Sequence, residues 1–133
     1  MISYSLDDTK KCYQISKDVM MEVMMGKMQN VTAMDDSGVP WENVVGFVSH
    51  NLPEDKAIFE AVHARGAMCI LGSSRNYDRQ YMSQKITETE LAAGYRSLID
   101  VGADIIEADL AIEAGNAIKP MQMAKSSKKR YFR

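Results

Sequence analysis

The sequence predicts an α/β fold in which five parallel strands alternate with helices. Short apolar segments recur along the chain between amphipathic segments of helical length. The apolar segments are hydrophobic on both faces, as in strands that lie beneath helices or inside a barrel. Strands that are separated by helices pair in parallel through right-handed crossovers, so the alternation indicates one parallel sheet or barrel.

The N-terminal half of the chain supplies three strands and two helices. Asp7 and Asp8 favour the first turn of the first helix, because carboxylates are stabilised at the positive end of a helix dipole. Gly38 and Pro40 end the second helix, since glycine favours a helix C-terminus and proline cannot continue one. In chain order we expect a strand over 2–5, a helix over 6–16, a strand over 19–25, a helix over 30–37 and a strand over 43–49.

The C-terminal half continues the same alternation. Pro53 suits the first turn of a helix, and Gly66 and Gly102 follow two helices at the position of a C-cap. The polar segment 73–85 is expected to be a loop. In chain order we expect a helix over 53–66, a strand over 67–72, a helix over 88–101, a strand over 102–109 and a short helical turn after it.

Candidate binding residues lie where the strands end. The loops that follow the strands are longer and more polar than those that precede them, and ligands of parallel α/β folds bind at that edge. We expect Glu22 to point into the barrel or crevice, where a neighbouring basic or hydroxyl group could pair with it, and Asp109 could equally cap the next helix. The candidate substrate-binding residues are Glu22, Ser49, His50, Asn76, Glu107 and Asp109.

Several other kinds of site are not indicated by the residues. His63 ends a helix, so we expect it at the opposite edge of the sheet. There its side chain would interact favourably with the negative end of the helix dipole. The chain contains no phosphate-binding glycine motif, no C-x-x-C and no H-E-x-x-H, and no complete metal site is visible in the sequence. We interpret Cys12 and Cys69 as buried free thiols. No segment reads as a signal peptide or a membrane span, and the compartment is left open.

Three segments together resemble the C-terminal half of the glycerophosphodiester phosphodiesterase family, which has a TIM barrel of the phospholipase-C-like type. They are ISYSLDD, HARGAMCILGSSRNYD and LIDVGADIIEADLAIEAG. The last one resembles the family strand Gly-hydrophobic-Asp-x-Ile-x-Thr-Asp at Gly102, Asp104, Ile106 and Asp109. The resemblance implies a partial (β/α) TIM barrel of about five strands in sequential order, with the helices outside.

The sequence also departs from the family pattern. Ala108 stands where the family has threonine, and Leu110-Ala111 replaces Arg-Pro. The resemblance implies that the intact enzyme hydrolyses a glycerophosphodiester to glycerol phosphate and an alcohol with a calcium or magnesium ion. The family's metal ligands and its general acid and base belong to the N-terminal half of the barrel. We therefore expect this chain to bind no metal and to be inactive alone.

Further expectations concern organisation and partners. Residues 1–118 are expected to form the barrel portion and 119–133 a basic tail, whose last nine residues, 125–133, contain five of the sixteen basic residues. Exposed strand edges predict a homo-oligomer, and we expect neither a nucleic acid partner nor a membrane span. A lipid- or nucleic-acid-binding role of the tail is a minor alternative. The main alternative is a small flavodoxin-like domain, which differs in strand order.

Overall fold

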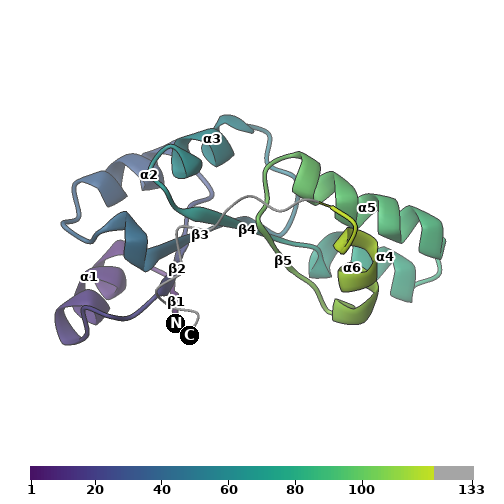
Figure 1. Ribbon diagram of the computed structural model, residues 1–133, viewed down its shortest axis with the longest axis horizontal. Helices are drawn as coiled ribbons and strands as arrows, with labels where there is room; N and C mark the ends of the chain where they lie inside the picture. Colours follow the sequence, from purple (N-terminus) through teal and green to yellow (C-terminus); the bar gives the residue numbers. More distant parts are fainter. Residues whose placement is uncertain (122–133) are drawn as a thin grey trace.

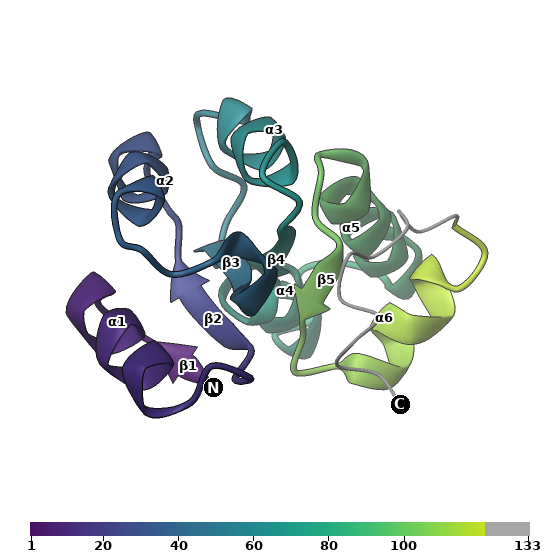
Figure 2. The ribbon, with the colours of Figure 1, turned by 60° about the vertical axis from the view of Figure 1, so that its left-hand side comes forward.

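The structure, a computed structural model, describes residues 1–121. Five strands form one parallel sheet in the order β1-β2-β3-β4-β5. The sheet is curved, and Figures 1 and 2 show the larger helices in an arc outside it. This sequential order confirms the partial barrel. It overturns the flavodoxin-like alternative, because a doubly wound sheet reverses its strand order part-way.

The strands are shorter than expected, and the helices that separate them are all present. The strands are β1 (Ile2–Ser3), β2 (Met21–Met24), β3 (Val44–Ser49), β4 (Met68–Gly72) and β5 (Ile105–Glu107). The helices are α1 (Leu6–Ile15), α2 (Met28–Asp35), α3 (Ala57–His63), α4 (Arg79–Met82), α5 (Glu88–Asp100) and α6 (Ala111–Ile118). A 3-10 turn (Trp41–Asn43) precedes β3, and a π-helical turn (Ser74–Asp78) follows β4.

Two predicted elements differ from the structure. The helix expected from Pro53 begins only at Ala57, whose N–H is accepted by the Asp55 side chain at 2.9 Å, so Pro53 lies in the preceding loop. The segment 73–85, expected to be a loop, contains the π-helical turn and α4. The N–H groups of Asn76 and Asp78 both donate to the Ser73 carbonyl, which closes this turn.

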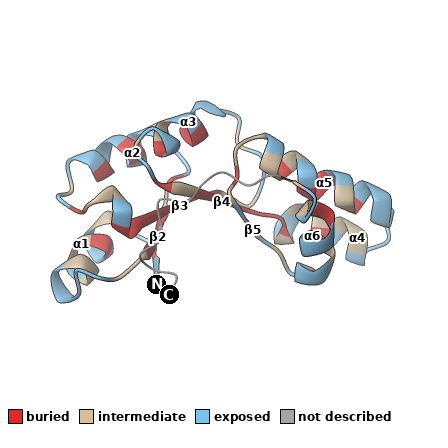
Figure 3. Ribbon diagram, in the orientation of Figure 1, coloured by how far each residue is buried: buried red, intermediate tan, exposed pale blue. Residues whose placement is uncertain are grey.

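The hydrophobic core lies between the sheet and the outer helices (Figure 3). On β2 and just after it, Met21, Val23 and Met25 are buried against the helices, whereas Glu22 and Met24 are only half-buried. Because successive side chains of a strand point to opposite faces, Glu22 and Met24 lie on the concave, inner face of the sheet. This confirms the predicted orientation of Glu22.

Other sequence predictions concern helix ends and thiols. Gly66 and Gly102 follow α3 and α5 with φ angles of 74° and 121°, a region that glycine adopts most readily. Cys12 and Cys69 are free thiols; Cys69 is fully buried as predicted, whereas Cys12 is only half-buried, so its predicted burial is wrong. Among the described residues, no helix has the length and apolarity that crossing a membrane requires. The predicted tail, apart from its first residues 119–121, lies outside the described residues.

Candidate functional site

Three of the predicted residues meet on the inner face of the sheet. Glu22 lies on β2, Glu107 ends β5, and His50 directly follows β3. The Nδ1 atom of His50 stands 3.6 Å from the Glu107 carboxylate. Gly72 of β4 permits this approach, since a Cβ at that position would lie 2.6 Å from His50 Nδ1 and 3.3 Å from Glu107 Oε2. The carboxyl ends of β3 and β5, which are distant in sequence, therefore bring His50 and Glu107 together, and Glu22 of β2 is near enough to interact electrostatically with both.

The electrostatics of this cluster favour a protonated carboxyl group. Burial raises the pKa of Glu22 above its usual value, and the neighbouring Glu107 carboxylate raises it further. The N-terminal amine and His50 act in the opposite direction with smaller effects. Within the described residues, the buried Nδ1 of His50 makes no hydrogen bond, while its ring packs edge-on against Phe47 at 4.8 Å. The cluster thus combines a carboxyl group of raised pKa with a buried histidine nitrogen that has no hydrogen-bond partner among the described residues.

The other three predicted residues lie at the edge of the sheet where the strands end, which we call the rim. Ser49 lines a cavity of about 520 Å³ between the loops after β2 and β3, and its hydroxyl accepts the Asn51 N–H at 3.0 Å. Asn76 lies in the π-helical turn, where its side-chain oxygen accepts a hydrogen bond from Gln80 at 2.8 Å. Asp109 is exposed just beyond β5. Its alternative role as a helix cap is wrong, because Leu110 is the N-cap residue of α6 and no side chain caps that helix.

Comparison with known proteins identifies the type of fold. No family model and no curated protein matches the sequence. The structure is similar to a glycerophosphoryl diester phosphodiesterase from Parabacteroides distasonis, with a TM-score of 0.84, 25% sequence identity and coverage of 98% of this chain and 44% of that chain. The fold is a partial glycerophosphodiester phosphodiesterase fold. The chain thus spans less than half the length of the protein that it matches.

The acids of the inner face do not by themselves fit the divalent cation that this phosphodiesterase fold implies. Calcium and magnesium bind six or more oxygen ligands arranged around one point. Within residues 1–121, the side chains of Glu22, His50, Glu107 and Asp109 include no group of three whose ligand atoms all lie within 4.8 Å of one another. This part of the phosphodiesterase fold therefore supplies at most part of a coordination shell.

Asp78 is a structural residue of the rim that sequence reasoning did not select. It is fully buried, its Oδ1 accepts the Tyr95 hydroxyl at 2.8 Å, and its Oδ2 accepts the Asp109 N–H at 2.6 Å. Asp78 thereby joins the loop after β4 to the loop after β5 and to α5. The sequence placed Asp78 in a loop at the functional edge, but its burial depends on contacts with residues 17 and 31 positions away.

His63 lies at the opposite edge of the sheet, as predicted. It is the last residue of α3, and its Nε2 is 2.8 Å from the carboxylate of Asp104, which precedes β5. The same carboxylate oxygen accepts the N–H of Cys69 at 2.8 Å. His63 therefore has a specific side-chain partner at this edge, and it is remote from the candidate substrate-binding residues.

Proposed function

We propose that this chain forms the part of a glycerophosphodiester phosphodiesterase barrel that lines the substrate pocket, and that hydrolysis needs the rest of the barrel. The observation that carries the proposal is the structural match over 98% of the chain. The sequence segments around Gly66 and Gly102 resemble the same family, and this resemblance supports the proposal independently. The reaction would be hydrolysis of a glycerophosphodiester to glycerol phosphate and an alcohol.

The inner-face residues suggest distinct roles in that reaction. Glu22 is suited to exchange a proton with the leaving alcohol, because its raised pKa keeps the carboxyl group protonated closer to neutrality. His50 offers a buried nitrogen without a hydrogen-bond partner, which could form a hydrogen bond with a phosphate oxygen. The carboxylate of Glu107 lies 3.6 Å from this nitrogen and could orient the ring.

The rim residues would bind the glycerol hydroxyls. Ser49, Asn76 and Asp109 offer a hydroxyl, an amide and a carboxylate, groups that donate to or accept from an alcohol. In the whole barrel a calcium or magnesium ion would polarise the phosphoryl group. Because the inner-face and rim acids among residues 1–121 do not converge on one point, no step of the reaction is assigned to an ion held by them.

The test compares the chain alone with a chimeric barrel. In the chimera, this chain replaces the matched 44% of the Parabacteroides distasonis protein. We expect the chimera, but not the isolated chain, to hydrolyse glycerophosphocholine in the presence of calcium or magnesium. In the chimera, Glu22→Gln should lower kcat by about 100-fold, whereas Glu113→Gln on α6 should leave it unchanged. Hydrolysis by the isolated chain at the rate of the chimera, or a folded but inactive chimera, would contradict the proposal.

Self-association through the sheet edges is a second part of the proposal. The outer edges of β1 and β5 have no neighbouring strand within the described residues, and such edges favour pairing with another chain. Ile2 beside one edge and Ile105 on the other are 53% and 38% exposed. We expect the isolated chain to form a dimer or larger oligomer. A monodisperse monomer at tens of micromolar in light scattering would be evidence against it.

A further inference from the structure

The edge of the sheet opposite the candidate substrate-binding residues carries a second cluster of chemical groups. His63, Cys69 and Asp104 each place a potential ligand atom there, and these atoms all lie within 4.8 Å of one another. They come from three elements: the end of α3, strand β4 and the segment before β5. Among residues 1–121, no other group of three His, Cys, Asp or Glu side chains meets this distance.

We propose that His63, Cys69 and Asp104 form a binding site for a zinc ion or a similar divalent transition metal. Imidazole nitrogen, thiolate sulfur and carboxylate oxygen are the ligand types that zinc uses. Ligand atoms that bind one tetrahedral zinc ion at about 2.0–2.3 Å stand roughly 3.3–3.7 Å apart. The observed spacing, from 2.8 Å between His63 Nε2 and Asp104 Oδ2 up to 4.8 Å, brackets that value. Small side-chain movements would therefore complete the coordination.

Charge balance favours an ion at this position. The Asp104 side chain is 8% exposed, and its carboxylate has only His63 and the Cys69 N–H as partners among the hydrogen bonds described above. One thiolate, one carboxylate and one divalent cation together carry no net charge, which reduces the cost of burial. Without a metal, burial raises the pKa of the Cys69 thiol to about 12, and the Asp104 carboxylate raises it in the same direction. A bound cation reverses this effect and deprotonates the thiol.

Access and proton balance are also satisfied. The His63 side chain is 38% exposed and lines an open cavity of about 400 Å³, which also contains Asp100. Neither Cys69 nor Asp104 lines this cavity, so an ion would reach His63 first, and water would occupy the fourth position. On binding, the thiol proton leaves to solvent, while a neutral His63 keeps its proton on Nδ1 and coordinates through Nε2. The coordinated ion would join α3, β4 and the start of β5.

This site is independent of the proposed hydrolysis. It lies at the other end of the strands, and its sulfur and nitrogen ligands select against calcium and magnesium, which prefer oxygen. A thiol site for a transition metal therefore can exist whether or not the chain belongs to a phosphodiesterase, and its test must not depend on hydrolysis.

The test uses cobalt(II) as a spectroscopic probe and zinc as a competitor. Purified full chain, reduced and freed of metal by chelation, is titrated with Co²⁺ while thiolate-to-cobalt charge-transfer absorption is recorded. We expect one equivalent to bind, with the release of protons, and one equivalent of Zn²⁺ but not of Mg²⁺ to displace it. Both Cys69→Ala and His63→Gln should weaken binding by at least about 100-fold, and Cys69→Ala should abolish the absorption band.

Matched variants of the remaining cysteine and histidine provide the controls. Cys12→Ala and His50→Gln should bind cobalt as the unchanged chain does. His63→Gln alters an exposed side chain and is expected to stay folded, so it decides the question even if Cys69→Ala unfolds. The proposal is overturned if no charge-transfer band appears with the unchanged chain, if Cys12→Ala removes the band, or if folded His63→Gln binds cobalt with unaltered affinity.

Discussion

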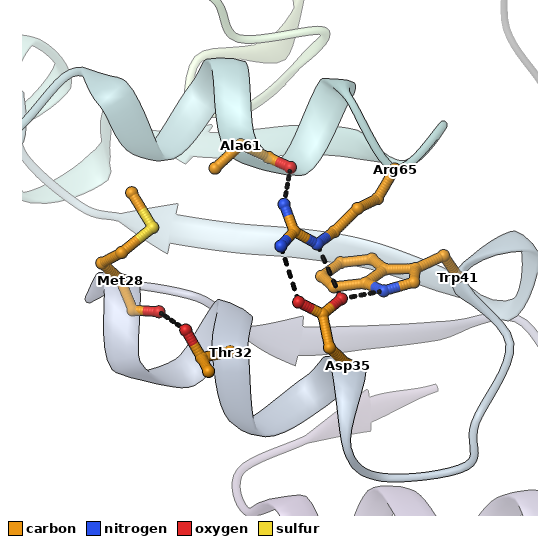
Figure 4. Close-up of polar contacts among 6 residues, drawn as sticks. All are labelled: Met28, Thr32, Asp35, Trp41, Ala61 and Arg65. Carbon is orange, nitrogen blue, oxygen red and sulfur yellow. Dashed lines mark hydrogen bonds and ion pairs between the residues drawn. The ribbon is translucent and has the colours of Figure 1, made fainter.

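The guanidinium of Arg65 and the carboxylate of Asp35 form a two-point ion pair that joins the segment after α3 to the last turn of α2 (Figure 4). The two N–O distances are 2.7 and 2.6 Å. The Trp41 indole N–H donates to the same carboxylate at 2.9 Å, and Arg65 also donates to the Ala61 carbonyl. These contacts fix two neighbouring helices at the edge of the sheet opposite the candidate substrate-binding residues.

Replacing Arg65 with lysine should lower the free energy of unfolding by about 1–2 kcal/mol, because an ammonium group cannot reproduce the planar two-point contact. The loss is small because about a third of each side chain is exposed, at 32% and 37%, and water screens the pair. Urea denaturation at pH 7 measures it, and Arg96→Lys, at an exposed position of α5, serves as the control. Equal stability of both variants would show that the two-point geometry of the contact contributes nothing.

The ion pair between Arg65 and Asp35 should also make the stability of the chain depend on pH in the acidic range. Hydrogen bonds from Arg65 and Trp41 hold the pKa of Asp35 below its usual value. The stabilisation is therefore complete above the pKa of an unfolded aspartate, about 3.9, and is lost as the pH falls through the lower folded pKa. Asp35→Asn should remove this part of the acid sensitivity in denaturation curves between pH 2 and 6. If stability falls equally with pH in the unchanged chain and in Asp35→Asn, Asp35 is not the source of this acid sensitivity.

Local sequence patterns predicted more of the fold than of its long-range contacts. The two-residue alternation of β2 correctly placed Glu22 on the inner face, and glycines marked the ends of α3 and α5. The partner of Arg65 is 30 positions away, and the helical structure around Asp78 depends on tertiary contacts. Neither has a local signal in the sequence. The meeting of His50 with Glu107 likewise depends on strand order, which periodicity alone left open between two folds.

Two helix glycines should respond in opposite ways to alanine. A Cβ on Gly94 of α5 would lie 2.6–2.8 Å from ring atoms of Tyr77, whereas nothing lies within 4 Å of one on Gly115 of α6. Alanine has the higher helix propensity, so Gly115→Ala should raise stability by about 0.5–1 kcal/mol. Gly94→Ala should instead lower it by about 1–3 kcal/mol through overpacking. Thermal denaturation checks both, and a stabilised Gly94→Ala variant would refute the close packing.

Removing the Tyr95 hydroxyl should destabilise the chain and increase local opening of the backbone at Asp109. Tyr95→Phe leaves Oδ1 of the buried Asp78 without its 2.8 Å donor, which should cost about 1–3 kcal/mol. Faster hydrogen exchange of the Asp109 amide, which is bound to the same carboxylate at 2.6 Å, would be the specific sign. Tyr81→Phe provides a control for the loss of a hydroxyl on a half-buried tyrosine. Unchanged exchange at Asp109 would mean that Asp78 does not couple the two loops.

The buried thiol of Cys69 predicts a loss of stability in alkali. Burial raises its pKa to about 12, so the folded state keeps the thiol neutral while the unfolded state ionises above about 8.5. The stabilisation is complete below that value, and it should fall by about 1.4 kcal/mol per pH unit above it. Cys69→Ala should show a shallower decline between pH 8.5 and 10, measured by denaturation with a chelator present. Identical slopes would mean that Cys69 ionises freely in the folded chain.

Glu22 should make the chain less stable as the pH rises, which is the opposite of the trend expected for the paired Asp35. Its pKa is raised by burial and by Glu107, so its favourable contribution is complete below the unfolded glutamate pKa, about 4.3. That contribution is lost as the pH rises through the folded value. Glu22→Gln should therefore stabilise the chain at pH 7 in urea denaturation, by an amount that partial exposure keeps small, and leave it unchanged at pH 4.

The partner carboxylate provides a second way to test the same coupling. Glu107→Gln removes a like charge, so it should shift the pKa of Glu22 toward its ordinary value, observable by NMR titration of the side-chain carboxyl carbon. Glu54→Gln, in the loop after β3, should leave that titration unaltered. If Glu22 titrates at its ordinary value in the unchanged chain, the inner face is more open to solvent than the structure indicates, and Glu22 has no special fitness as a proton donor.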